Sequence, residues 1–260
     1  MTIVEAFISG CIQGIAEFFP ISSSGHLVLL HHLFGIDKPH VTFDVLLHVG
    51  TLCSIFIFFR TDIIKMFTTQ KKLALTIIIG SIPTAIIGFI YKDTIEALFV
   101  KPRIVGFMFL LTALFLLLAA AREKFFPSTS ARNTTGKTGK IPSFLAALVI
   151  GTVQGIAIIP GLSRSGATIS TGILAGVERE MAVTFSFLLA IPAILGASLL
   201  KFSEPISENI ELLPAAVGFL SAFMLGLASL KILRRAVIKS KLYIFALYCI
   251  GVGLFTIFRF

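Results

Sequence analysis

Long apolar stretches alternate with short polar segments along the whole chain, and six of these stretches are close to the length that a membrane crossing needs. A helix of about 20 apolar residues spans the hydrocarbon core of a bilayer, which is roughly 30 Å thick. The pattern therefore predicts six membrane-spanning helices. They cover residues 42–59, 73–91, 103–121, 181–200, 212–230 and 242–258.

Two further apolar regions, 1–36 and 141–177, do not fit a single crossing. In each region a Ser/Gly-rich motif separates two apolar arms, and a helical arm of about ten residues spans only about 15 Å. We expect both regions to form re-entrant helix–loop–helix hairpins with tips near the middle of the membrane. Irregular backbone at that depth is tolerated only where it lines a buried or water-filled cavity.

The two hairpin regions are copies of each other. Residues 10–25 read GCIQGIAEFFPISSSG, and residues 151–166 read GTVQGIAIIPGLSRSG. This duplication predicts a single membrane domain of two repeats, 1–121 and 141–260, joined by the polar linker 122–140. Each repeat holds one hairpin and three crossings, and because three is odd, the second repeat is inserted upside down. The predicted fold is an all-α polytopic membrane protein with an inverted-topology repeat, in which the two hairpin tips can meet.

Basic residues are distributed unequally between the predicted loops. Loops 60–72, 122–140 and 231–241 carry four, five and five Lys or Arg residues, whereas 92–103, 201–211 and the C-terminal tail carry three, one and one. Cytoplasmic loops of membrane proteins are enriched in Lys and Arg. We therefore expect the first set of loops to face the cytoplasm and the first hairpin to enter from the outside.

Composition agrees with this assignment. The chain is 56% hydrophobic and 13% charged, with a mean hydropathy of +0.99, which excludes an ordinary soluble fold. The net charge of +9 is explained by the loops, so nucleic acid is not an expected partner. The three cysteines lack metal-ligand spacing and are expected to be packed free thiols.

The first motif, residues 17–26, brings together several reactive side chains. Glu17, Ser23 and His26 supply a carboxylate, a hydroxyl and an imidazole, which are candidates for metal ligand, nucleophile and base. An ionisable group at membrane depth is costly. We therefore expect Glu17 to be functional.

The second motif, residues 160–168, has the composition of an anion site. Arg164 stands between Ser163 and Ser165, with Gly166 and Thr168 following where a helix should resume. Backbone N–H groups at a helix start, hydroxyls and a guanidinium together bind phosphate well, and Arg can do so with two hydrogen bonds.

Structural interpretations compete with these assignments. Ser and Gly commonly mediate close packing of membrane helices, and Glu17 and Arg164 could form a purely structural ion pair. Two matched motifs with complementary charges favour a site. We expect Asp44 and His48 to pair with each other at a helix end for structural reasons. No role is assigned to three histidines expected at the outer interface, His31, His32 and His40.

The stretches QGIAEFFPISSSGH and PGLSRSGAT closely resemble the undecaprenyl pyrophosphate phosphatases, also called the bacitracin-resistance phosphatases. The resemblance covers the whole chain. It implies an integral membrane enzyme that hydrolyses undecaprenyl (polyprenyl) pyrophosphate to the monophosphate and inorganic phosphate. That reaction recycles the lipid carrier for cell-wall glycan synthesis, and excess enzyme confers resistance to bacitracin. The resemblance also implies a need for a divalent cation, Mg²⁺ or Ca²⁺, and a location in the inner (plasma) membrane with the site opening to the outer side.

Roles follow by position from this resemblance. Glu17 and Gln13 match the family's E/Q-x-x-x-E motif, with Glu17 as catalytic group and metal ligand, although many relatives carry Glu where this chain has Gln13. Ser23 and His26 match the catalytic Ser and His, and Arg164 is the catalytic arginine of the second motif. The remaining substrate-binding positions are Gln13, Ser22, Ser24, Gly25, Ser163, Ser165, Gly166 and Thr168.

Several alternatives stay open at this point. The nucleophile is Ser23 with His26 as its base, His26 itself, or a metal-activated water. The rival function is a transporter or flippase of a lipid phosphate or small anion, because broken helices in inverted repeats are equally typical of transporters. Membrane lipids are expected partners besides the polyprenyl substrate, and the sequence leaves a homodimer open.

Overall fold

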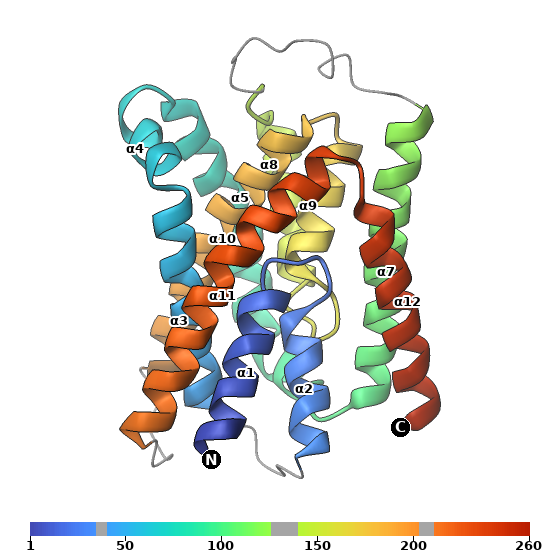
Figure 1. Cartoon of the computed structure of the whole chain (residues 1–260). Coiled ribbons are helices and arrows are strands. Elements are labelled where there is room, and N and C mark those ends of the chain that lie inside the picture. The colour runs from blue at the N-terminus through green and yellow to red at the C-terminus, as the bar shows by residue number, and fades with distance from the viewer. Residues whose placement is uncertain (35–40, 126–139, 203–210) are drawn as a thin grey trace.

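The computed structural model describes residues 1–34, 41–125, 140–202 and 211–260. These residues form α-helices joined by short turns, and none of the described residues belongs to a β-strand (Figure 1). The helices are α1 (Ile3–Ala16), α2 (Ser23–Leu33), α3 (Val41–Phe58), α4 (Arg60–Thr68), α5 (Lys71–Ile90), α6 (Lys92–Glu96), α7 (Pro102–Phe125), α8 (Phe144–Ile156), α9 (Arg164–Leu174), α10 (Arg179–Phe202), α11 (Leu212–Ile238) and α12 (Leu242–Arg259).

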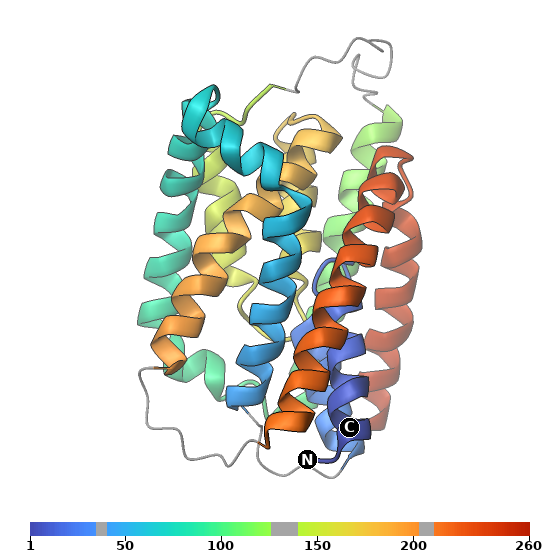
Figure 2. The ribbon, with the colours of Figure 1, turned by 60° about the vertical axis from the view of Figure 1, so that its left-hand side comes forward.

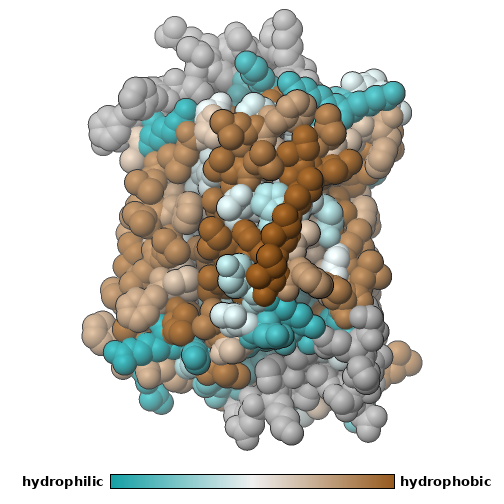
Figure 3. Space-filling view, turned by 180° about the vertical axis from the view of Figure 1, so that it is seen from behind, coloured by the Kyte–Doolittle hydropathy of each residue, from teal (hydrophilic) through white to brown (hydrophobic). Residues whose placement is uncertain are grey.

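The predicted crossings are confirmed as apolar helices of sufficient length. Five helices, α5, α7, α10, α11 and α12, can each cross a membrane, and α3 with α4 forms a sixth apolar unit that bends by 67°. Hydrophobic residues cover the middle of the molecule and hydrophilic residues gather towards its two ends (Figure 3). The chain is therefore an all-α, multi-pass membrane protein.

Each predicted hairpin region holds two helices that are too short to cross. Helices α1 and α2 have 14 and 11 residues, and α8 and α9 have 13 and 11. Even the longest spans only about 20 Å at 1.5 Å per residue. Figure 1 shows α1 rising from the lower end to a loop near mid-height, while α8 descends from the upper end. The two hairpins thus enter from opposite ends, and their tips meet inside the molecule.

Proline and an unusual backbone conformation break each hairpin at its tip. Pro20 and Pro160 follow the first helix of their hairpins, and proline removes a helical hydrogen-bond donor and clashes with the preceding turn. The chain then reverses through Ser22 (φ 65°) in the first hairpin and through Gly161 (φ +94°) in the second. Positive φ at Ser22, a non-glycine residue, is sterically unfavourable, which marks this tip as a constrained segment.

The two repeats exchange their first helices. Helix α1 packs against α11 of the other half, α8 packs against α5, and α7 pairs with α12, as both ribbon views show for the first and last pairs (Figures 1 and 2). Glycines allow this close approach: a Cβ built on Gly10 would lie 2.4 Å from the Gly218 carbonyl oxygen, and one on Gly151 would lie 1.8 Å from that of Gly80. Small residues let membrane helices approach closely. Each hairpin is therefore held by the opposite repeat.

One predicted loop is a helix. Residues 60–72 were expected to be a cytoplasmic loop, whereas most of them form α4, which contains no buried residue and exposes Ile64 and Phe67. Such an amphipathic segment is too polar to resemble a crossing but suits the membrane interface. Most of the linker 122–140, most of 201–211 and His40 lie outside the described residues, and the repeat boundaries stay predictions.

The contact between α8 and α5 can be tested at Gly151. The Gly151→Ala substitution should lower stability by at least about 1–3 kcal/mol, because the added methyl group overlaps the Gly80 backbone. Gly196→Ala is the matched control, since a Cβ at Gly196 meets nothing within 4 Å. We expect thermal unfolding in detergent to show a lower midpoint for Gly151→Ala only. Equal midpoints for the two variants would contradict the close α8–α5 contact.

Candidate active site between the two hairpin tips

The carboxylate of Glu17 is the centre of the polar cluster at the tips. It lies at the end of α1, is 7% exposed, and forms an ion pair with Arg164 at the start of α9. Its other oxygen accepts a hydrogen bond from Ser23 Oγ at 2.6 Å and one from Gln13 Nε2 at 3.1 Å. The structure therefore brings three predicted site residues, from both repeats, to the carboxylate of a fourth.

The two tips use the same local geometry to start their second helices. Ser22 Oγ accepts from the Gly25 N–H at 3.2 Å, and Ser163 Oγ accepts from the Gly166 N–H at 3.1 Å. Each cap serine also lies 3.3 Å from the serine two residues later, Ser24 or Ser165. Serine is a favoured N-cap residue because its oxygen pairs an otherwise unpaired helix N–H. The duplicated sequence motif therefore forms the same helix cap at the tip of each hairpin.

Two helix starts facing one site produce a positive electrostatic environment. Helix α2 begins at Ser23 and α9 begins at Arg164, both at the meeting point of the tips. The N-terminus of a helix carries a partial positive charge and unpaired N–H groups. Together with the guanidinium of Arg164, these helix starts carry more positive charge than the single carboxylate of Glu17 neutralises. The site therefore favours a ligand with more than one negative charge.

Arg164 has hydrogen-bonding capacity to spare. Its Nη2 pairs with Glu17, whereas its buried Nη1 has no hydrogen-bond partner within the described ranges. A guanidinium can bind two oxygens of a phosphate group at once. Arg164 is therefore the side chain of the second motif best placed to receive an anion.

His26 is held by two hydrogen bonds and two aromatic rings. Its Nδ1 lies 2.7 Å from the Ser22 carbonyl oxygen, and its Nε2 lies 2.7 Å from the Tyr248 hydroxyl. The ring stacks on Tyr248 and meets the edge of Phe109. A carbonyl only accepts hydrogen bonds, so Nδ1 must carry the proton, and the neutral ring accepts from Tyr248 at Nε2.

Ser23 and His26 do not form the pair that the sequence suggested. Ser23 donates its hydrogen bond to Glu17, and both His26 nitrogens are engaged elsewhere. The group that accepts a hydrogen bond from the Ser23 hydroxyl is therefore the Glu17 carboxylate. His26 lies one turn further along α2, at the edge of the cluster formed by Tyr248 and Phe109.

The hydroxyls of the second motif mainly fix its shape. Ser165 Oγ donates to the Phe19 carbonyl at 3.3 Å, which ties the two tips together. Thr168 Oγ1 donates to the Arg164 carbonyl at 2.7 Å and lies 2.6 Å from the Ser186 hydroxyl of α10. The predicted role of these two residues in binding phosphate stays a prediction, since in this structure their hydroxyls position Arg164.

Asp44 and His48 do pair, but through the backbone carbonyl of Asp44. His48 Nδ1 bonds the backbone carbonyl of Asp44 at 2.7 Å, which turns Nε2 towards Glu17, 3.7 Å from its carboxylate. The Asp44 carboxylate lies 3.8 Å from His31, which is buried in the protein. The backbone carbonyl of Asp44, rather than its carboxylate, accepts the hydrogen bond from His48 Nδ1. His48 consequently belongs to the surroundings of the site.

Sequence reasoning missed two further residues of the site. Tyr248 comes from α12, 222 residues from its partner His26. Thr112 of α7 accepts from the Ser163 N–H at 2.9 Å and donates to the Gly161 carbonyl at 3.2 Å, so it fixes the second tip. The available signal was a polar side chain inside a predicted crossing, which usually lies in the interior of the helix bundle.

The oxygen atoms of Glu17 and Gln13 fit a divalent cation that also binds phosphate oxygens of a ligand. No group of three or more His, Cys, Asp or Glu side chains suited to a metal occurs in the described part of the chain. The buried amide oxygen of Gln13, however, has no hydrogen-bond partner among the residues that the structure describes, and it belongs to the side chain beside the Glu17 carboxylate. Mg²⁺ is usually held by one or two carboxylates together with water and substrate phosphate oxygens. One carboxylate and one amide oxygen satisfy that requirement.

The fold and this cluster define a class: a polytopic membrane protein with an anion site between two opposed hairpin tips. The family model described as bacitracin resistance protein BacA matches residues 6–255. The chain is 42% identical to the undecaprenyl-diphosphatase of Carboxydothermus hydrogenoformans, over 95% of this chain and 94% of that protein. The undecaprenyl-diphosphatases of Desulfosudis oleivorans (42% identity, 96% of each chain) and Methanosphaera stadtmanae (39% identity, 99% of this chain and 98% of that protein) are similar throughout. The chain belongs to the BacA family.

The hydrogen bonds of His26 predict one tautomer of its ring. In ¹⁵N NMR at a pH where the ring is neutral, Nδ1 should give a protonated, pyrrole-type shift and Nε2 a pyridine-type shift. A His26→Gln variant identifies the signals among the five histidines of the chain. A protonated Nε2 with a bare Nδ1 would contradict the arrangement of Ser22, His26 and Tyr248.

Proposed function

We propose that this chain is an integral membrane phosphatase that hydrolyses undecaprenyl diphosphate to undecaprenyl monophosphate and inorganic phosphate. Its relatives over the full length are undecaprenyl-diphosphatases. The observation that carries the proposal is the convergence of Arg164, two helix starts and the Ser23–Glu17 pair inside the membrane. The enzyme resides in the cytoplasmic membrane and recycles the lipid carrier, which confers resistance to bacitracin.

The site opens to the outer side in this proposal. The first hairpin enters from the end opposite the basic segments 60–72 and 231–241 (Figure 1). Because cytoplasmic loops are enriched in Lys and Arg, that end faces outwards. The diphosphate of a lipid in the outer leaflet then reaches the tips along α1 and α2, while its prenyl chain stays among the apolar helices.

Binding of the diphosphate changes the partners of Arg164. In the free protein its Nη2 is paired with Glu17 and its Nη1 has no partner in the described segments. A terminal phosphate group placed at the start of α9 accepts from the guanidinium and from the N–H groups of the helix start. Glu17 is then released from Arg164, while it stays hydrogen-bonded to the Ser23 hydroxyl.

Ser23 is the nucleophile that the geometry favours, because its hydroxyl lies 2.6 Å from the Glu17 carboxylate. Ser23 Oγ forms a bond to the terminal phosphorus as the bond from that phosphorus to the bridging oxygen breaks. The proton passes from Ser23 to Glu17, and the prenyl monophosphate leaves with the bridging oxygen. The departing monophosphate takes the proton from Glu17, which is then a carboxylate again. Glu17 next accepts a proton from a water molecule, whose oxygen bonds to the phosphorus as the bond to Ser23 Oγ breaks. Inorganic phosphate leaves, and Glu17 returns the proton to Ser23 Oγ.

Glu17 and the amide oxygen of Gln13 would hold a divalent cation, Mg²⁺ or Ca²⁺, which would neutralise negative charge on the diphosphate. No feature of the described residues favours the transporter or flippase alternative. Transport of a lipid phosphate does not require a nucleophile and a base, whereas Ser23 and Glu17 form such a pair beside the proposed anion site.

Phosphate release from undecaprenyl diphosphate by purified protein in detergent tests the function, with Mg²⁺ and with a chelator. Gln13→Ala and Glu17→Ala form a matched pair, since each removes one of the neighbouring side chains. Glu17→Ala should lose the general base and about 100-fold or more in rate. Gln13→Ala should lose about tenfold or less, as one hydrogen bond to the carboxylate disappears.

Two results would overturn the proposal. If folded wild-type protein releases no phosphate with or without the cation, the chain is not this phosphatase. If release proceeds but the two variants lose equal activity, Glu17 is not the principal carboxylate. Thermal unfolding of each variant in the same detergent establishes that it is folded.

A further inference from the structure

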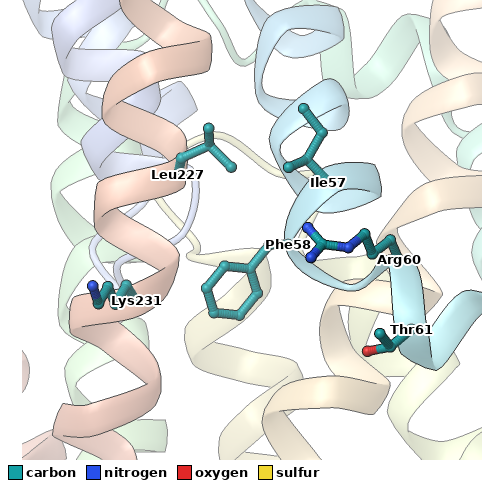
Figure 4. Close-up of a pocket in the computed structure, with 6 residues that line it drawn as sticks. All are labelled: Ile57, Phe58, Arg60, Thr61, Leu227 and Lys231. Carbon is teal, nitrogen blue, oxygen red and sulfur yellow. The ribbon is translucent and has the colours of Figure 1, made fainter.

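A groove separate from the hairpin tips lies between the bend of α3 into α4 and the facing side of α11. It has a volume of about 280 Å³ and is lined by Ile57, Phe58, Arg60, Thr61, Leu227 and Lys231 (Figure 4). The wall from α3 and α4 presents the Phe58 ring and the Arg60 side chain, and the α11 wall presents Leu227 and Lys231. The groove thus combines apolar side chains with two cations.

Neither cation of the groove forms an ion pair with an acidic residue of the described ranges. Asp62 stands two positions from Arg60, yet its carboxylate does not pair with it. The basic residues Arg179 and Arg234 near the same end, by contrast, have partners in the protein. The charges of Arg60 and Lys231 are therefore available to a molecule outside this chain.

The groove lies at the level of the inner membrane interface. Arg60 and Lys231 belong to the basic segments that the charge distribution assigns to the cytoplasmic end. Helix α4, which begins at Arg60, has no buried residue and exposes Ile64 (61%) and Phe67 (73%), as expected of a helix lying in the interface. A molecule that fits there needs a negative head at interface depth and an apolar chain towards the membrane centre.

We propose that this groove binds an anionic phospholipid of the inner leaflet, a role beyond the phosphatase activity and independent of it. The phosphodiester lies between Arg60 and Lys231, and one acyl chain follows Ile57, Phe58 and Leu227. Basic pockets between transmembrane helices on the cytoplasmic side are suited to anionic head groups. The bound lipid holds the α3–α4 bend against α11.

Native mass spectrometry of the purified full chain in detergent tests this site with phosphatidylglycerol, phosphatidylcholine and inorganic phosphate as probes. The test variant is Arg60→Gln with Lys231→Gln. The control variant is Lys71→Gln with Lys72→Gln, which removes two exposed charges from the same end of the molecule without touching the groove. We expect wild type and control to retain phosphatidylglycerol equally, and the test variant to bind it about tenfold more weakly.

Phosphatidylcholine and inorganic phosphate should bind weakly and equally to all three proteins, because one lacks net negative charge and the other lacks an acyl chain. Equal retention of phosphatidylglycerol by the test variant and wild type would overturn the proposal. So would binding of inorganic phosphate that is tight in the wild type and lost in the test variant. A change of oligomeric state in the test variant, with lipid retention unchanged, would assign the groove to a second copy of the chain and also overturn it.

Discussion

The ion pair between Glu17 and Arg164 joins the two halves of the molecule at the depth where charge is most costly. Placing a charged side chain in the bilayer interior is unfavourable unless it meets a partner or polar surroundings. Neither hairpin tip supplies such surroundings alone: the first carries the carboxylate and the second the guanidinium. The inverted insertion of the repeats brings the tips together, and the exchange of α1 and α8 between the halves holds them there.

The residues that the two hairpin motifs share and the residues in which they differ have separate roles. The shared serine caps start α2 and α9 at the same place and create two sources of N–H groups. The differing residues supply the opposite charges, with Glu17 in one copy and Arg164 in the other. In the proposed function this asymmetry places a nucleophile and base in the first copy and phosphate recognition in the second. The ion pair between Glu17 and Arg164 lowers the cost of burying both charges.

Much of the fold follows from hydropathy alone, because the bilayer imposes a fixed length on each crossing. The predicted crossing 73–91 is observed as Lys71–Ile90, and 242–258 as Leu242–Arg259. Helix α11 continues to Ile238, past the predicted end at 230, because Lys and Arg are good helix formers even though they leave the apolar core. Hydropathy could not reveal α4 as a helix, since its exposed apolar side chains alternate with polar ones.

The sequence indicated which residues lie together at the hairpin tips, but not which of them pair. Matched motifs identified Glu17, Ser23 and Arg164, whereas the bond from Ser23 to Glu17 in place of His26 depends on the direction in which α2 leaves the tip. The contact of His26 with Tyr248 joins the first repeat to the last helix, and no local pattern encodes it. His48 is another case: its side chain reaches Glu17 only because a backbone carbonyl fixes its ring.

The most direct test of the central claim is the affinity of wild type and Arg164→Gln for a non-hydrolysable methylene analogue of a prenyl diphosphate, measured by calorimetry. If the substrate takes Arg164 from Glu17, loss of the guanidinium should weaken binding about tenfold to 100-fold, as expected for charge-assisted hydrogen bonds. Arg259→Gln, at the far end of α12, should bind like wild type. Unchanged affinity in folded Arg164→Gln protein would contradict the account, because the Glu17–Arg164 pair would then be structural only.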